Sequence, residues 1–240
     1  MEKAELIQAL HRDGTALATA ADQHLTRSVA SCPGWTMSDL MWHTTRVHNA
    51  IVQIIRDGVQ GFDKLVPVKR AHDDELIKTY SAGLQDLINV ATQADPTAMI
   101  WSWTGPVGST WAVRRMTQET AVHAWDAANA VGISTAIEAV LASDGIDEFL
   151  SNFLPRGREG VPAVGGSVHI HCTDVAGEWT ITQPDARTFV VTREHAKGTC
   201  AIRGAASDVL LALWRRLPLS QVEIIGDAGV AQRFIEHTAL

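Results

Sequence analysis

The sequence predicts an α+β protein of two domains, in which an N-terminal up-down helical bundle precedes a small C-terminal α+β domain. Apolar residues recur at helical spacing through the first half of the chain, whereas short alternating or β-branched runs follow residue 163. Residues 155–162 separate these regions with two prolines and two glycines among polar side chains, which is typical of a linker. We therefore expect a bundle over residues 1–155 and an α+β domain over residues 163–240.

Five amphipathic helices are expected in the first domain. Apolar stripes mark their buried faces, and Thr36 or Ser38 can cap the second helix after the break at residues 32–34. Because most of the connections are short, an antiparallel bundle is the expected packing. The predicted helices cover residues 2–28, 36–58, 73–92, 113–131 and 135–153.

The second domain is expected to combine short strands with two helices. The strands are predicted from β-branched and alternating runs, and the helices from longer apolar stripes. The expected strands cover residues 167–173, 178–182, 188–192, 200–203 and 222–225, and the expected helices cover residues 207–216 and 229–237.

Composition and charge argue against several classes of protein, including nucleic-acid-binding and membrane-spanning proteins. The chain holds 27 acidic and 20 basic residues, a formal net charge of −7, which argues against a nucleic-acid or anionic-membrane partner. Its three cysteines are too few and too scattered for a disulfide framework, so a cytoplasmic location is expected. No segment approaches the roughly 20 apolar residues that span a bilayer, and the N-terminus lacks a signal pattern. Ten histidines remain to be explained.

Three polar residues stand where the helical pattern requires apolar side chains. Glu119 and His123 lie one turn apart on the stripe of helix 113–131, and His43 occupies the same kind of position in helix 36–58. Buried carboxylates and imidazoles are costly unless they are paired or bound to a metal, and two histidines with one glutamate are a known catalytic zinc set. The spacing leaves two other interpretations open, a surface ion pair for Glu119 and His123 and a hydrogen-bonded core histidine for His43.

Longer motifs give the chain a family resemblance. In chain order they are CPGWTMSDLMWH at residues 32–43, RMTQETAVHAWD at 115–126, TD at 173–174, GEW at 177–179, RGAASDVLLALWRRLP at 203–218 and GD at 226–227. Their order and spacing resemble the mycothiol-dependent maleylpyruvate isomerase family of actinobacteria. The resemblance covers nearly the whole chain.

This resemblance implies a DinB-like bundle in which His43, Glu119 and His123 hold a divalent metal, usually zinc. The fourth position on the metal would be open to the thiol of mycothiol, which serves actinobacteria in place of glutathione. The second domain would resemble sterol-carrier-like modules and would contribute an arginine, which alignment places at Arg216. A glycine is commoner in the family where Arg215 stands, so the role could fall on either arginine.

The implied reaction uses mycothiol and a small electrophilic substrate. A metal-bound thiol is deprotonated, and the thiolate would add to a cis enoyl acid such as maleylpyruvate, allow rotation, and leave to give the trans product. Arg216 would stabilise the developing charge or hold a carboxylate, and Asp126 would orient an imidazole. Both catalytic candidates have plainer interpretations, Arg216 as a cation at a helix C-terminus and Asp126 as an exposed helix residue.

Two other functions are compatible with the sequence. The same thiolate could transfer mycothiol to another electrophile, as an S-transferase does, or the metal could stabilise a non-catalytic binding module. An open fourth position favours catalysis, whereas a fourth protein ligand would close the site. His48 lies about 140° around the helix from His43 and is poorly placed to close it. The chain could be a monomer or a homodimer.

Three further features receive plainer interpretations. His169 and His171 share one face of a predicted strand, but the spacing supplies no third ligand for a metal. Cys32 is expected to be a packed thiol. The tryptophans of residues 101–111 are expected to pack their loop onto the bundle.

Overall fold

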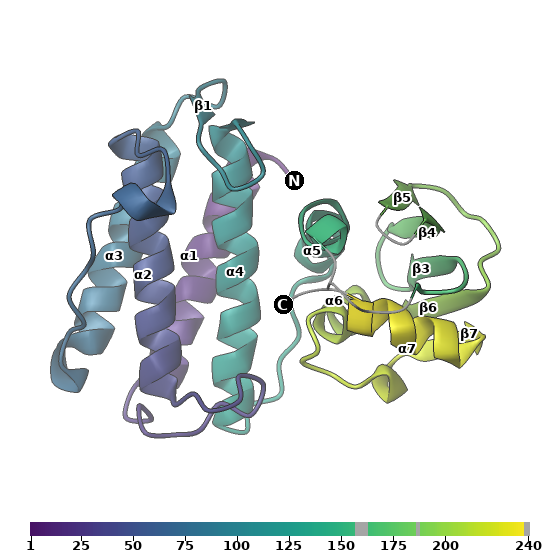
Figure 1. The fold of residues 1–240 in the computed structure, drawn as a ribbon. Helices are drawn as coiled ribbons and strands as arrows, with labels where there is room; N and C mark the ends of the chain where they lie inside the picture. The colour runs from purple at the N-terminus through teal and green to yellow at the C-terminus, as the bar shows by residue number, and fades with distance from the viewer. Residues whose placement is uncertain (157–162, 186–187, 238–240) are drawn as a thin grey trace. The chain divides into compact units, whose positions relative to one another are not determined.

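The computed structural model describes residues 1–156, 163–185 and 188–237 and confirms an α+β protein with a helical N-terminal part and a strand-containing C-terminal part (Figure 1). Its elements group into two units, Met1–Thr135 and Ala136–Leu240. Six residues of the expected linker, 157–162, lie outside the described residues.

Four long helices make up most of the first unit. α1 packs against α3 and α4, and α2 packs against the same two helices. Their bounds are α1 Lys3–Ala21, α2 Met37–Arg56, α3 Asp73–Gln93 and α4 Ser109–Ala130, with a short 3-10 helix η1 at Phe62–Lys64. The remaining regular structure is a two-stranded hairpin, β1 Met99–Ile100 and β2 Val107–Gly108.

The start of α2 is fixed by a capping box. The Thr36 side chain accepts a hydrogen bond from the Asp39 backbone, and the Asp39 carboxylate accepts one from the Thr36 backbone. This exchange satisfies backbone donors that a helix N-terminus otherwise leaves unpaired. His43 lies four residues after Asp39, one turn further along α2.

Helix directions do not simply alternate along the bundle. Ser38 in the first turn of α2 donates to Asp73 in the first turn of α3, and Arg56 at the end of α2 pairs with Asp86 further along α3. These two helices therefore run parallel, as Figure 1 also shows. The segment between them, residues 57–72, returns the chain along the bundle. Lys3 at the start of α1 donates to a carbonyl just beyond α3, so α1 and α3 are antiparallel.

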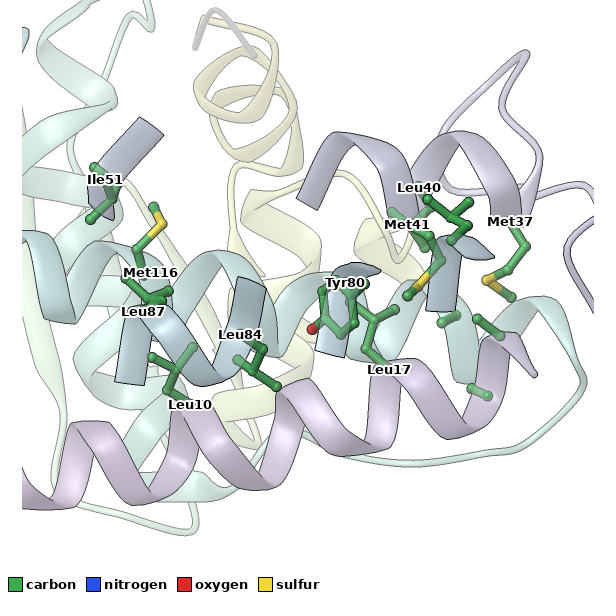
Figure 2. Packing of buried hydrophobic residues seen from close by; sticks show 14 of the residues in the cluster. Leu10, Leu17, Met37, Leu40, Met41, Ile51, Tyr80, Leu84, Leu87 and Met116 are labelled. Atoms are coloured by element: carbon green, nitrogen blue, oxygen red, sulfur yellow. The ribbon is translucent and has the colours of Figure 1, made fainter. Parts of the chain in front are cut away.

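The core of the first unit is formed by aliphatic side chains, methionines and one tyrosine. Figure 2 shows Leu10, Leu17, Leu40 and Met116 distributed along this core between the helices. Tyr80 is fully buried among them, and its hydroxyl donates to the Gly14 carbonyl. That hydrogen bond offsets the cost of burying a polar group in an apolar core.

The tryptophan-rich connection between α3 and α4 is folded on itself. Trp103 packs edge-on against Trp111, and Phe62 from η1 packs edge-on against Trp101. Trp101 and Trp103 lie in the connection of the small β1–β2 hairpin, where the sequence predicts only a loop. The contacts agree with the expectation that the tryptophans hold this connection in place.

A five-stranded sheet forms the centre of the second unit. Its strand order is β5-β4-β3-β6-β7, in which β3 and β6 are parallel and the other neighbours are antiparallel. The strands are β3 Val168–Cys172, β4 Glu178–Asp185, β5 Thr188–Thr192, β6 Cys200–Gly204 and β7 Glu223–Gly226. The helices are α5 Ala139–Asn152, α6 Ala206–Leu213 and α7 Ala228–His237, with 3-10 helices η2 Leu154–Arg156 and η3 Leu219–Gln221.

Helix α5 belongs to the second unit, whereas the sequence predicts it in the first domain. Its Asp147 accepts from the Trp179 indole on β4 and pairs with Arg193 after β5. Ser143 donates to the carbonyl of Ala176. The units therefore divide at residue 135, about 20 residues before the expected linker.

Helix α4 is long enough to cross a membrane, but its composition is too polar. α4 has 22 residues, but they include Arg114, Arg115, Glu119 and Asp126. Among the helices of the described residues, none combines sufficient length with the apolar composition that crossing a bilayer requires.

Candidate metal centre

The antiparallel packing of α2 on α4 brings the three predicted ligands together. His43 Nε2 lies 3.0 Å from Glu119 Oε1, and His123 Nε2 lies 3.2 Å from the same oxygen. The rings of His43 and His123 meet edge-on with centroids 5.1 Å apart. One donor atom from each of the three residues lies within 4.8 Å of the other two. Two helices thus supply two imidazoles and one carboxylate at a single point.

This cluster is reachable from solvent. The side chains of His43 and Glu119 are 25% and 20% exposed, whereas that of His123 is 8% exposed. The Trp35 ring lies 5.0 Å from the His43 ring and restricts its orientation. His43 and Glu119 therefore present the side that a small molecule can reach, and His123 lies deeper.

Arg115 holds the second oxygen of Glu119. Its Nη2 lies 2.6 Å from Glu119 Oε2, and the arginine side chain is nearly fully buried. Arg115 stands four residues before Glu119, a spacing that places both on one helix face. The motif at residues 115–126 begins with Arg115 but does not by itself predict a role for it. The i,i+4 spacing to the carboxylate of Glu119 is the signal that identifies it.

Asp126 contacts the other nitrogen of the His123 ring. His123 Nδ1 lies 2.9 Å from Asp126 Oδ2, and Asp126 is fully buried rather than exposed on the helix surface. The Cys32 thiol also donates to this carboxylate oxygen, with sulfur and oxygen 3.6 Å apart. A carboxylate on Nδ1 places the ring proton there and leaves Nε2 to face Glu119 and His43.

Charges within the cluster shift the pKa values of its members. Burial by itself would raise the pKa of Glu119, but hydrogen bonds from His123 and His43 and the charge of Arg115 hold it well below the usual range. Burial would lower the pKa of His123, but Asp126 and Glu119 raise it to about 9. Without a metal, His123 is therefore protonated at neutral pH and forms an ion pair with Glu119. A divalent cation at the same point would replace that proton.

His48 lies five residues beyond His43, on another face of α2, and takes no part in the cluster. Its Nε2 lies 2.9 Å from the Thr120 hydroxyl, and the residue is fully buried. Burial lowers its pKa to about 4, so the ring is neutral at physiological pH. Among the described residues, the grouping around Glu119 contains three donors, with no fourth from His48.

Arg215 and Arg216 lie in the second unit, directly after α6. The Arg215 guanidinium donates to the carbonyl of Ile235 near the end of α7, at 2.9 Å. Arg216 Nη1 donates to the Trp214 carbonyl, and its guanidinium carbon lies 6.0 Å from the Trp214 ring centroid. The role of Arg216 toward a substrate stays a prediction.

Comparison with known families assigns both parts of the chain. Residues 7–128 match the mycothiol maleylpyruvate isomerase N-terminal domain, and residues 140–233 match the MDMPI C-terminal domain. The boundary between the two matches falls close to the division of the structure at residue 135. No curated protein matches the chain.

Two solved structures share the fold over most of the chain. One is the mycothiol-dependent maleylpyruvate isomerase, at a TM-score of 0.64 and 11% identity, and the other is a histidine-to-alanine mutant described under the same enzyme name, at 0.63 and 10%. In both comparisons 93% of each chain is covered. Since the N-terminal domain match spans half of the sequence and the C-terminal match most of the remainder, the chain belongs to the mycothiol-dependent maleylpyruvate isomerase family.

Proposed function

We propose that this protein is a mycothiol-dependent isomerase of the maleylpyruvate type, with His43, Glu119 and His123 holding a divalent metal. The observation that carries the proposal is the convergence of these three donors from two helices on a partly exposed point. Two imidazole nitrogens and one carboxylate oxygen suit zinc, and a three-ligand set leaves a coordination position for a thiol. Family membership supplies the class of thiol and substrate.

A divalent ion at this point would keep a thiol sulfur ionised at neutral pH, and such a sulfur adds reversibly to an activated cis double bond, which is the chemistry of cis-trans isomerisation. Asp126 and Arg115 orient two of the three ligand residues. Asp126 accepts the Nδ1 proton of His123, so that Nε2 faces Glu119 and becomes a ligand when an ion displaces its proton. Arg115 occupies Glu119 Oε2 and leaves Oε1 toward both imidazoles.

The substrate class adds a requirement for a cation. Maleylpyruvate carries carboxylates, and negative charge develops on its carbonyl side when a nucleophile adds to the double bond. A guanidinium can bind a carboxylate with two parallel hydrogen bonds. Arg216 is the residue we propose for this contact, because the family resemblance places the arginine there.

Metal content and turnover test the proposal together. We expect the purified protein to lose one equivalent of divalent metal on His123→Ala and to isomerise maleylpyruvate only when mycothiol is supplied. His11→Ala, on the exposed face of α1, is the matched control and should keep both properties. Unchanged metal content in His123→Ala would contradict the metal centre. Bound metal with conjugation of a model electrophile but no isomerisation would instead favour the S-transferase.

A further inference from the structure

A second group of imidazoles lies in the second unit, on one face of the sheet. His169 and His171 alternate along β3, so their side chains share a face. The strand register places His171 directly opposite Glu178 on β4. His195 follows β5, in a segment anchored by the Thr180 hydroxyl, which donates to the carbonyl of Glu194. Three stretches that are separate in sequence therefore meet above the β3–β4 pair.

Both outer histidines point a nitrogen at the same carboxylate. His195 Nδ1 lies 3.2 Å from Glu178 Oε2, and His171 Nδ1 is in direct contact with Glu178 Oε1. The His169 ring lies against those of its neighbours, with centroids 5.0 Å from His195 and 5.9 Å from His171. Ligand atoms of all four residues lie within 4.8 Å of one another.

His169 gives an independent indication that a ligand belongs here. The residue is 7% exposed, and its Nε2 is buried without a hydrogen-bond partner. A buried nitrogen without a partner destabilises the fold unless something binds it.

The charged residues beside the group are engaged elsewhere. Arg203, opposite His171 on β6, pairs with Glu223 at 2.7 Å. Arg193 pairs with Asp147 of α5, and the Glu194 carboxylate accepts from the Thr192 hydroxyl. None of these contacts satisfies the nitrogens of His169.

We propose that His169, His171, Glu178 and His195 form a second metal site, for a divalent transition ion such as Zn²⁺. Three imidazole nitrogens and one carboxylate oxygen provide a full tetrahedral set. A site with four protein ligands is structural rather than catalytic. The ion would tie the segment after β5 to the centre of the sheet, and it is separate from the centre between α2 and α4.

Zinc titration of the full-length protein tests this site apart from the first. In a His123→Ala background, stripped with a chelator, we expect calorimetry to show one remaining equivalent of Zn²⁺. Adding His195→Ala should weaken that binding by on the order of 100-fold. The His195 side chain is 75% exposed, so its truncation removes little packing. His11→Ala in the same background is the control.

Cobalt substitution supplies the second readout. Co²⁺ in a tetrahedral site absorbs strongly in the visible range, and we expect this absorption in His123→Ala and its loss when Glu178→Gln is added. Glu178→Gln preserves size while removing the charged ligand. Absence of Zn²⁺ binding in His123→Ala, or binding unaffected by His195→Ala and Glu178→Gln, would overturn the proposal and leave a hydrogen-bonded histidine cluster. Neither result depends on isomerase activity, so failure here leaves the proposed function standing.

Discussion

His123 is held between two carboxylates of its own helix. Glu119 lies one turn before it and contacts Nε2, while Asp126 lies one turn after it and contacts Nδ1. Each carboxylate favours the charged imidazolium, and together they outweigh the cost of burial. The same arrangement serves a metal, because loss of the Nε2 proton exposes a lone pair while Asp126 keeps the ring in place.

The pH dependence of the metal-free protein should reveal this arrangement. The pKa of His123 rises from an ordinary 6.5 to about 9 on folding, so its contribution to stability is complete below about pH 6.5 and is lost as pH rises through about 9. We expect the free energy of unfolding to fall over this range by on the order of 3 kcal/mol. In Asp126→Asn the fall should be smaller, because a neutral amide stabilises the imidazolium less.

Urea denaturation of chelator-treated protein between pH 6 and 9.5 measures the effect. Asp86→Asn, at an exposed carboxylate of α3 that pairs with Arg56, is the control and should retain the wild-type pH profile. Equal pH profiles for wild type and Asp126→Asn would show that Asp126 does not set the charge of His123.

Individual site residues were predictable from the sequence wherever one helix determines their neighbours. The spacing of Glu119 and His123 placed both on one face, and the polar interruption of a second stripe pointed to His43. The second cluster needed information that spacing does not contain. His171 meets Glu178 only through strand register, and His195 reaches them only because the segment after β5 folds back over the sheet.

The two adjacent arginines that follow α6, Arg215 and Arg216, differ in backbone conformation and in side-chain contacts. Arg215 has a φ of 58°, and the Arg216 amide donates to the Leu211 carbonyl, which is the geometry of a left-handed helix C-cap. Glycine is favoured at such a position because it lacks a Cβ. This explains why the family resemblance expects glycine where Arg215 stands. The Arg215 side chain instead donates to the Ile235 carbonyl and joins α6 to α7.

Substitutions at the two arginines should therefore have different consequences. Arg215→Gly should be more stable than Arg215→Ala by about 1 kcal/mol, because only glycine adopts the left-handed conformation without strain.

Arg216→Ala should lower kcat/KM for maleylpyruvate by about 100-fold through loss of a charge-stabilising donor, with metal content unchanged. Thermal unfolding, metal analysis and steady-state kinetics separate these effects. Full activity in Arg216→Ala together with lost activity in Arg215→Gly would reverse the assignment.

The approximate positions of the helices could be predicted from apolar periodicity, but the residues at which they end and the directions in which they run could not. The stripe predicted for the first helix continues through Leu25, yet α1 ends at Ala21, because Gln23 adopts a φ of 61° and Leu25 pairs its carbonyl with the Ser38 amide. Periodicity also says nothing of direction. The length of the 57–72 segment was the only indication that α2 and α3 are parallel. These residues can extend over about 50 Å, which is enough to return along α2, a helix of about 30 Å.

At the scale of the whole molecule, each unit has its own core and its own cluster of metal-ligating residues. The first unit buries side chains from four helices, and the second packs α5, α6 and α7 with a five-stranded sheet. His43, Glu119 and His123 all lie before residue 135, and the cluster around Glu178 lies wholly after it. The division at residue 135 also agrees with the two family matches, whereas the proline and glycine stretch at 155–162 suggested a later boundary.

Two independent units predict two separable responses to metal. We expect Zn²⁺ added to stripped wild-type protein to slow amide hydrogen exchange in α2 and α4 and, separately, in β3, β4 and residues 193–199. His123→Ala should retain only the second response, and His195→Ala only the first, because each ion restrains the backbone that carries its own ligands. Exchange followed by mass spectrometry of peptides measures both in one experiment, with His11→Ala retaining both responses. Loss of both responses in either single variant would show that the two clusters are coupled and do not bind metal as independent sites.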